Sequence, residues 1–500
     1  MNIANNLNRS AFYFPDRPAI IEDGKEITYA RFSLDSDRVA AGLARLGLRP
    51  GELAAICMSS GYCWLAVYFG ILKAGGVAVT LSNALTDREL ALALRDARPG
   101  VLFTDEGRLE EIGRRDDFPF LTTVVSPGGD IDYDGLLDLA SGRFSCIDRD
   151  RGDTAAVLFT GGTTGTPKGA MLTHENIMTS ACNVSHNERS TPEDRVLCFL
   201  PLNHVFGQIH IANATIYSGG CIVMLPAFDP DRALHAVGAH GVTKLYAVPT
   251  IYVRLLQLTS LKDKLGSLRY CFSAAASMAA ELVREWKDRL ALDIHEAYGM
   301  TESASMVTYN HYYRHVVGSV GTTVGSIEVR ISDPDGNMLG PGQEGEICIK
   351  GPNIMKGYLN RTEETREAFR DGWFRSGDIG VMGDDGYLYM VDRIKDMIIT
   401  GGENVYPREI EELLYTRPEV QECTVIGLPD KEYGERVTAF IIPGEGRQLD
   451  PDVLKLFLKE RLSPYKVPKA FIAVADLPRS PAGKILKREL KKAEAERQNK

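Results

Sequence analysis

The segment 155–173, AAVLFTGGTTGTPKGAMLT, holds the residues best suited to chemistry. Its apolar start at 155–159 predicts a strand, and a loop of four glycines, four threonines, one proline and one lysine follows. Glycines let backbone N–H groups approach a ligand closely, threonines add hydroxyl donors, and the lysine adds positive charge. A phosphate chain uses all of these groups at once. The expected donors are Thr160, Gly161, Gly162, Thr163, Thr164, Thr166 and Lys168.

A kinase-type P-loop fits this segment poorly. That motif needs Gly immediately before the Lys and Ser or Thr after it, whereas Pro167 precedes Lys168 and Gly169 follows it. A flexible Gly/Thr linker is the alternative, and it is disfavoured because a strand-like and a helix-like segment bracket the loop. The loop is therefore expected to bind phosphates in another way.

The loop resembles the phosphate-binding signature of the ANL superfamily, which comprises acyl- and aryl-CoA synthetases, carrier-loading adenylation domains and firefly-type luciferases. Five further segments match that family's motifs in the same order and extend the resemblance over nearly the whole chain. They are PLNHVFG at 201–207, AYGMTES at 297–303, GWFRSGDIG at 372–380, DRIKDMIITGGENVYPREIE at 392–411 and SPAGKILKREL at 480–490. TGGTTG in the loop is most similar to the fatty-acid–CoA ligase branch.

The resemblance implies that AYGMTES binds the nucleotide and its metal. Tyr298 would lie against adenine, Gly299 would allow a close approach, and Thr301 would reach the α-phosphate. Glu302 would bind Mg²⁺, because a lone carboxylate plus phosphate oxygens usually holds this ion. Without the resemblance, Glu302 is more simply an exposed surface carboxylate.

The next two motifs are implied to serve the ribose, a hinge and CoA. Asp378 would accept both ribose hydroxyls with its two oxygens, and Arg393 would assist it. Lys395 matches a hinge position, and Gly401 and Gly402 match the loop that meets the pantetheine arm of CoA. The simpler alternatives are a turn-capping aspartate, a surface ion pair between the arginine and a neighbouring aspartate, and a plain hairpin turn.

The last motif contains the residue with the largest implied catalytic role. Lys484 would bridge the substrate carboxylate and the α-phosphate. His204 in PLNHVFG is a further candidate catalytic residue, and Ala275 and Ala276 would border the adenine and the acyl group. In isolation Lys484 is one solvated lysine of a basic tail, since residues 455–500 hold 13 basic and 5 acidic residues.

The implied reaction joins a carboxylic acid to a thiol, with ATP, Mg²⁺ and CoA as cofactors. The carboxylate attacks the α-phosphorus to give acyl-AMP and pyrophosphate, and the thiol then attacks the mixed anhydride. We expect a medium- or long-chain fatty acid, with an aryl acid of the benzoate or 4-coumarate type as the alternative. Amino acids are disfavoured because 203–206 holds no Asp to pair an ammonium, and malonate because Ala297 replaces an Arg.

Two other functions stay open. The enzyme could load a carrier protein in trans, because the basic C-terminal segment suits an acidic carrier as well as the CoA 3′-phosphate. A non-enzymatic adenylate sensor on the same scaffold is disfavoured, because Lys484, Glu302 and Asp378 are all retained.

These motifs need a scaffold that brings distant segments together. Alternating strand and helix signals over the first 300 or so residues predict parallel sheets with covering helices, and turn signals after about 320 predict a β-rich part. We expect an α/β protein with a large N-terminal domain (1–394) of two α/β subdomains plus a β-rich subdomain. A small mobile α+β domain (395–500) would follow. The clearest expected elements are strands at 53–58, 77–81, 101–104, 221–225, 244–248 and 268–273, and helices at 64–74, 87–96, 230–239 and 279–290.

Composition agrees with an ordinary globular protein. The 500 residues are 44% apolar and 25% charged, which excludes a disordered or collagen-like chain, and the net charge of −10 argues against nucleic-acid binding. The nine scattered cysteines predict free thiols. No apolar run approaches the roughly 20 residues of a membrane span, so we expect a cytoplasmic protein without an integral membrane segment. The expected partners are the acid, ATP and CoA, and a homodimer is compatible with the sequence.

Overall fold

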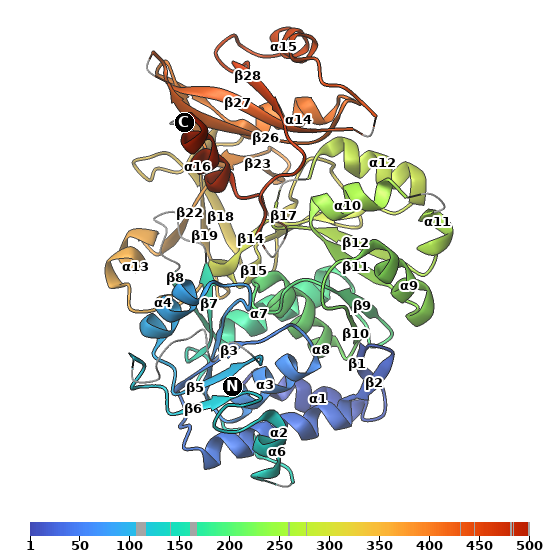
Figure 1. The fold of residues 1–500 in the computed structure, drawn as a ribbon, viewed down its shortest axis with the longest axis vertical. Helices are drawn as coiled ribbons and strands as arrows, with labels where there is room; N and C mark the ends of the chain where they lie inside the picture. Colours follow the sequence, from blue (N-terminus) through green and yellow to red (C-terminus); the bar gives the residue numbers. More distant parts are fainter. Residues whose placement is uncertain are drawn as a thin grey trace.

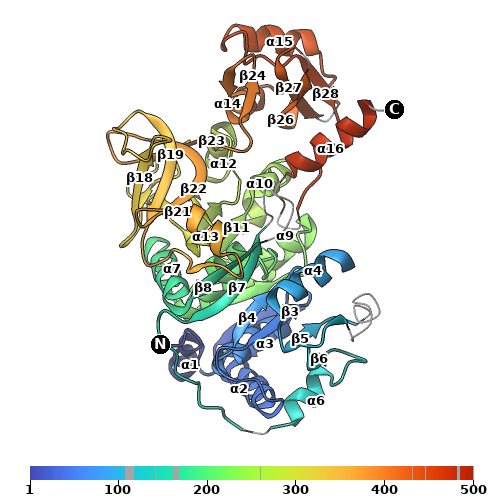
Figure 2. The ribbon, with the colours of Figure 1, turned by 90° about the vertical axis from the view of Figure 1, so that its left-hand side faces the viewer.

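The computed structural model describes residues 1–500 apart from 107–116, 141, 161–167, 259–260, 277, 431, 445, 481–482, 484 and 499–500. Two large, mostly parallel sheets and a smaller antiparallel sheet precede Lys395, and a fourth main sheet follows it. In Figures 1 and 2 the elements after Lys395 lie together at one end of the molecule. The α/β class, with a large N-terminal and a small C-terminal part, is confirmed.

The first sheet carries both sides of the Gly/Thr loop. Its strands β7, β4, β3, β5 and β6 are parallel, and β8 and β20 add two antiparallel strands beyond β7. Helix α3 (Tyr62–Lys73) connects β3 to β4 and is almost wholly buried, because it is apolar on all sides. In sheet order the strands are β20 (Gly357–Tyr358), β8 (Lys168–Thr173), β7 (Thr154–Thr160), β4 (Val77–Thr80), β3 (Leu53–Cys57), β5 (Val101–Thr104) and β6 (Thr123–Val125).

The second sheet has six parallel strands and one antiparallel edge strand, β2. The carboxyl ends of parallel strands meet at one edge of a sheet, so the loops that follow β9, β11, β12 and β13 lie near one another. These loops contain His204, Val248, Ala275 and Tyr298. In sheet order the strands are β13 (Ile294–Glu296), β12 (Tyr270–Ser273), β11 (Lys244–Ala247), β9 (Arg195–Cys198), β10 (Cys221–Met224), β1 (Pro18–Glu22) and β2 (Lys25–Thr28).

Helices cover these two sheets, and several begin with a side-chain cap. Thr86 and Thr173 each form a reciprocal capping box, with Glu89 and Asn176 respectively. A π-helix, η2 (Phe206–Asn213), follows His204. The other helices of this part are α1 (Asn5–Tyr13), α2 (Tyr29–Arg45), α4 (Asp87–Ala97), α6 (Tyr133–Asp138), α7 (His174–Asn187), α8 (Ala214–Ser218), α9 (Pro230–His240), α10 (Pro249–Leu256), α11 (Leu261–Lys264), α12 (Ala280–Leu290) and α13 (Thr362–Ala368).

The third sheet is antiparallel and completes the nucleotide side of the molecule. The register of β22 with β23 places Asp378 directly opposite Arg393. Two short pairs, β14 (Gly299–Met300) with β15 (Ser305–Met306) and β16 (Thr308–Tyr309) with β17 (Thr322–Thr323), lead into this sheet. Its strands are β18 (Glu328–Ser332), β19 (Glu344–Lys350), β22 (Trp373–Met382), β21 (Phe369–Arg370) and β23 (Leu388–Arg393).

The part after Lys395 has its own hydrophobic core. Side chains of Ile398, Ile410, Val425, Ala439 and Leu454 are all fully buried in it, separately from the core of the two parallel sheets. A separate core is what an independently folding domain requires. Its elements are β24 (Ile398–Thr400), β25 (Glu403–Val405), α14 (Pro407–Tyr415), β26 (Val420–Asp430), β27 (Gly434–Pro443), α15 (Pro451–Lys459), β28 (Ala470–Ala473) and α16 (Lys487–Gln498).

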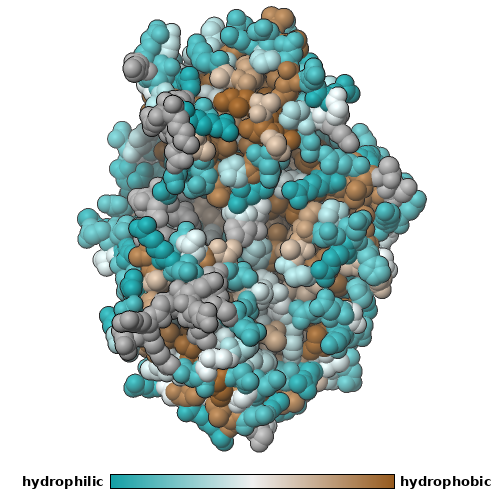
Figure 3. Space-filling model, viewed as in Figure 1, coloured by the Kyte–Doolittle hydropathy of each residue, from teal (hydrophilic) through white to brown (hydrophobic). Residues whose placement is uncertain are grey.

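Polar side chains are mixed with smaller apolar patches on the face of the molecule shown in Figure 3. Within the described ranges, no helix has both the length and the apolarity needed to cross a membrane. All nine cysteines are free, as their spacing predicts.

Candidate active site

The base of the Gly/Thr loop is a strand hairpin. Thr160 at the end of β7 pairs with Lys168 at the start of β8, and the Thr160 hydroxyl donates to the Lys168 carbonyl over 3.3 Å. The sequence predicted a helix-like segment after the loop, but β8 comes first because it pairs with both β7 and β20. Gly161, Gly162, Thr163, Thr164 and Thr166 lie outside the described residues.

Tyr358 joins the base of this loop to Glu302. Its hydroxyl donates to Glu302 Oε1 over 2.8 Å, and its ring lies beneath Lys168, with Nζ 5.2 Å from the ring centroid. Burial, and then the Glu302 carboxylate, raises the pKa of the tyrosine. Tyr358 was not predicted, because nothing in the sequence indicates that β20 pairs with β8.

Glu302 is the acidic residue that the sequence predicts as a Mg²⁺ ligand. It lies half-buried in η3 (Thr301–Ser303), beside the half-buried Thr301, and its carbonyl accepts from Met355 N over 2.8 Å. The described part of the chain contains no cluster of three or more His, Cys, Asp or Glu side chains suited to a metal. A Mg²⁺ ion held by Glu302 would therefore complete its shell with phosphate and water oxygens, as this ion commonly does.

The backbone before and after Glu302 is tightly constrained. A Cβ at Gly299 would lie 1.5 Å from the Ser305 carbonyl oxygen, so only glycine fits there. Ala304 and Ser305 have φ values of 50° and 108°, which L-residues rarely adopt. Ala304 and Ser305 lie at the end of the turn that connects β14 to β15. Thr301 and Glu302 lie in the same turn.

A three-residue cluster forms at the expected ribose position. Asp378 is only 3% exposed, and its two oxygens accept from Tyr298 Oη over 2.8 Å and contact Arg393 Nε at 3.1 Å. Two of the simpler alternatives do not hold. Asp378 lies within strand β22 rather than in a turn, and Arg393 pairs with Asp378 rather than with a neighbouring aspartate, because cross-strand register outweighs proximity in sequence.

Ala275 and Ala276 follow β12 at the carboxyl edge of the second sheet. Ala275 has a φ of 70°, a conformation that favours glycine, and Ala276 is exposed. Relatives with glycine at this motif would avoid the strain. That these two alanines border the adenine and the acyl group stays a prediction.

His204 lies in the loop between β9 and η2 and is half-buried. Its Nδ1 accepts from Phe206 N over 3.2 Å. The same loop is tied to the first sheet, because Leu202 N donates to Ser60 Oγ over 2.9 Å. Both parallel sheets therefore hold this segment in place.

A buried polar network lies behind His204 and Glu302, and the sequence did not indicate it. His210 on η2 contacts Ser305 Oγ at 3.0 Å through Nδ1 and Glu188 Oε1 at 2.7 Å through Nε2. Tyr246 donates to the same carboxylate, and Lys244 Nζ lies 3.7 Å from it. Burial alone would raise the pKa of Glu188, but His210, Lys244 and Tyr246 outweigh it and lower that pKa. Glu188 is therefore ionised although it is fully buried among these side chains.

The expected hinge falls between two strands of different sheets. Lys395 lies in the turn between β23 and β24, after Asp392, whose carboxylate accepts from the backbone N–H of Arg393 and of Arg408. Arg408, on α14, also donates to the Met390 carbonyl over 2.7 Å. The C-terminal part is thus anchored to β23 at a few polar contacts.

Gly401 and Gly402 form the two-residue turn of the β24–β25 hairpin. Their φ values of 61° and 86° are those of a tight turn that requires glycine-like freedom at both positions. This turn is exposed, and the structure leaves their expected contact with CoA as a prediction.

Lys484 itself lies outside the described residues, whereas the preceding residue, Gly483, is described. Gly483 sits against the carboxyl end of β11, where an added Cβ would lie 2.9 Å from Val248 Cγ2. A bridge between Arg479 and Ile485 closes the loop. Gly483 therefore lies at the carboxyl edge of the second sheet, the edge that also carries His204 and Tyr298.

Known proteins share this architecture. The family described as "AMP-binding enzyme" matches residues 7–359, and "AMP-binding enzyme C-terminal domain" matches residues 409–484. The chain is 35% identical to a long-chain-fatty-acid–CoA ligase of Bacillus subtilis over 98% of this chain and 94% of the relative. It is 37% identical to a feruloyl-CoA synthase of an Amycolatopsis species over 97% of each.

Among solved structures, MatB from Rhodopseudomonas palustris is 36% identical and covers 99% of both chains. The TM-score is 0.91 for its ATP-bound form and 0.81 for its apo form. The chain therefore belongs to the AMP-binding enzyme family, within the ANL superfamily of adenylate-forming enzymes. It is an AMP-forming acyl-CoA synthetase.

Proposed function

We propose that this acyl-CoA synthetase activates a compact, ring-bearing carboxylic acid as its acyl-AMP and transfers the acyl group to CoA. The enzyme uses ATP, Mg²⁺ and CoA. The buried network around Glu188 is the observation that supports the acid class. On sequence alone a fatty acid comes first, but the network moves our proposal to the aryl alternative.

We infer that the acyl group would lie next to this network, because His210 and Ser305 contact each other and follow His204 and Glu302 by six and three residues. A long alkyl chain there would separate His210 from the ionised, fully buried Glu188 carboxylate, and a buried charge that loses one of its hydrogen-bond partners is destabilised. A single ring could instead pack on the aromatic side chains and leave the network intact.

The side chains around His210 are mainly aromatic. The ring centroids of His210 and Phe272 lie 4.4 Å apart, and those of Phe206 and His210 lie 5.3 Å apart. Such side chains accommodate the flat face of an aryl acid by offset or edge contact.

We assign the sequence-predicted residues as follows. Asp378 and Arg393 hold the ribose, with Tyr298 fixing the carboxylate of Asp378, and Glu302 holds Mg²⁺ in a position set by Tyr358. When bound, Mg²⁺ neutralises phosphate charge as the carboxylate attacks the α-phosphorus. Thr301 and Lys484 stabilise the charge that develops on the α-phosphate, and His204 contacts the acid.

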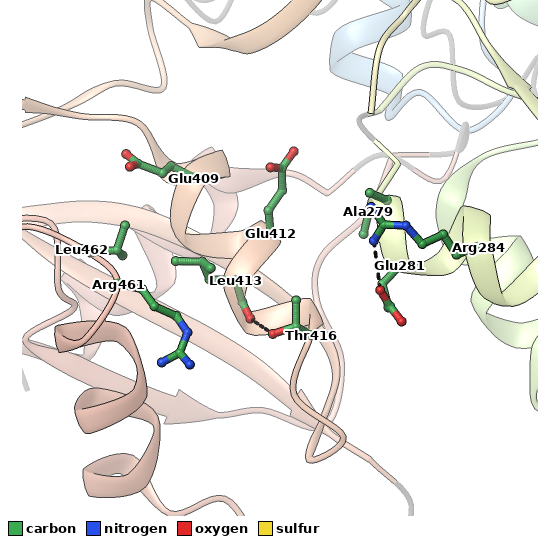
Figure 4. Close-up of a pocket in the computed structure, with 10 residues that line it drawn as sticks. Ala279, Glu281, Arg284, Glu409, Glu412, Leu413, Thr416, Arg461 and Leu462 are labelled. Atoms are coloured by element: carbon green, nitrogen blue, oxygen red, sulfur yellow. Dashed lines mark hydrogen bonds and ion pairs between the residues drawn. The ribbon is translucent and has the colours of Figure 1, made fainter. Parts of the chain in front are cut away.

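We also propose that 395–500 is a mobile domain hinged at Lys395, with 1–394 as the adenylation domain. A cavity of about 420 Å³ separates α12 from α14, and Figure 4 shows Glu412 and Leu413 on one side of it and Arg284 on the other. An interface this open lets one domain rotate on the other. The present arrangement suits adenylation, because Gly483 lies against Val248 and the ATP-bound MatB superposes better than the apo form.

The acid class is tested by measuring thioester formation with benzoate, 4-coumarate, octanoate and palmitate, using the wild type and His210→Leu. We expect kcat/KM to be highest for an aryl acid, and His210→Leu to improve octanoate relative to 4-coumarate. A wild-type preference for palmitate would overturn the proposed acid class and restore the fatty acid. Adenylation with no CoA product would point to a carrier protein as acceptor.

A further inference from the structure

A second cavity lies in the first sheet, apart from the site just described. It encloses about 180 Å³ at the carboxyl ends of β3, β5 and β6. In the sheet, β4 lies on one side of β3, and β5, the next strand along the chain, lies on the other side of β3. The cavity therefore lies where the strand order reverses. Open α/β sheets bind ligands at such a switch point. Strand β4 separates it from β7 and its Gly/Thr loop, a displacement of about 10 Å at the usual strand spacing.

Two buried hydroxyls in its lining have no hydrogen-bond partner among the residues that the structure describes. Thr104 is only 2% exposed and lines the cavity, yet its Oγ1 is unpaired. Tyr133 Oη, also in the lining, is buried and unpaired as well. Leaving a buried polar group without a partner is unfavourable, so these two atoms indicate a missing hydrogen-bonding group.

The rest of the lining is apolar at the back and acidic at the mouth. Met58, Phe103, Val125 and Pro127 supply apolar surface for a ring. Asp105, which fixes Ser59 through two 2.8 Å hydrogen bonds, and the exposed Glu106 supply carboxylates. Burial raises the pKa of the thiol of Cys63, another lining residue, and the carboxylates of Glu22, Asp35 and Asp134 lie close enough to raise it further. The nearby cation Arg31 is paired with Asp35. Within the described lining, these carboxylates favour a cation over an anion such as ATP, CoA or the acid substrate.

We propose that this cavity binds a single-ring molecule that carries a polar group on the ring and an ammonium on a short side chain. A cavity of about 150 Å³ is enough for benzene, so 180 Å³ accommodates one substituted ring. The ring polar group pairs with Thr104 and Tyr133, and the ammonium lies beside Asp105 and Glu106.

Cys63 provides a direct readout, because it is exposed and lines the cavity. The probe is tyramine, and alkylation of Cys63 by N-ethylmaleimide in the full-length protein is followed by peptide mass spectrometry. With tyramine about tenfold above its Kd, alkylation should slow about tenfold, since only the free protein reacts. Cys146 and Cys182, which are partly buried elsewhere, serve as internal controls and should react unchanged.

Two variants test whether the cavity binds the probe through the proposed groups. Thr104→Val with Tyr133→Phe keeps the shape of the cavity and removes both hydroxyls, and should weaken tyramine protection at least tenfold. Glu106→Gln, on an exposed side chain, should weaken tyramine but leave protection by the neutral probe 4-ethylphenol unchanged. No protection by either probe, or equal protection in the double hydroxyl variant, would overturn the proposal.

Discussion

Removing the hydroxyl of Tyr358 should impair the metal site without removing any group expected to touch a substrate. Tyr358→Phe deletes the 2.8 Å hydrogen bond to Glu302 and keeps the ring beneath Lys168. A hydrogen bond to a charged group contributes about 1.5–3 kcal/mol, and the half-buried Glu302 places this one at the low end. About 1.4 kcal/mol corresponds to a tenfold loss of kcat/KM for Mg-ATP.

A double-mutant cycle with Glu302→Gln shows whether the tyrosine acts through that carboxylate. Adenylation is followed by pyrophosphate–ATP exchange at several Mg²⁺ concentrations. We expect the Tyr358→Phe variant to need more Mg²⁺, and its tenfold loss to shrink to nearly nothing in the Glu302→Gln background. An equal loss in both backgrounds, or a single variant with wild-type Mg²⁺ dependence, would refute this reasoning.

The other predictions concern the ribose cluster, the tight turn, a buried acid and the mobile lysine. Asp378→Asn leaves Arg393 without its carboxylate and should raise the KM for ATP at least about tenfold, with the KM for the acid changing less. Gly299→Ala would force its Cβ onto the Ser305 carbonyl, 1.5 Å away, so the free energy of unfolding from urea titration should fall by about 2 kcal/mol or more. Burial raises the pKa of Glu296 to about 8, so the native state binds more protons than the unfolded state between pH 4.5 and 8, and stability falls as pH rises through this window. Glu296→Gln should remove that fall, and parallel pH profiles of Tm for the two proteins would contradict it. Lys484→Ala should slow adenylation by about 10²–10³ and leave thioester formation from supplied acyl-AMP nearly unchanged, a split that equal losses in both half-reactions would rule out.

Most of the scaffold could be predicted because its strands are short apolar runs between turn signals. The segments 101–104 and 244–248 became β5 and β11 almost residue for residue. Strand β8 could not be predicted in the same way, because its partners β7 and β20 are brought together only by the tertiary fold.

In the site, too, residues within local motifs could be predicted, whereas residues that depend on tertiary contacts could not. Asp378, Arg393, Tyr298 and Glu302 could be located because they stand in recognisable motifs, although the alternative readings of Asp378 and Arg393 stayed open until the β22–β23 register was known. Tyr358 and the Glu188 network stand in no motif. Their importance comes from burial and from contacts between residues far apart in the chain, which a single sequence does not encode in any local pattern.

This chain is expected to form an acyl-adenylate before it forms a thioester. The decisive assay is acid-dependent exchange of labelled pyrophosphate into ATP, measured without CoA. We predict exchange that requires both the acid and Mg²⁺, followed on addition of CoA by stoichiometric AMP and acyl-CoA. Acyl-CoA formation without any exchange, or with ADP in place of AMP, would exclude an acyl-adenylate intermediate.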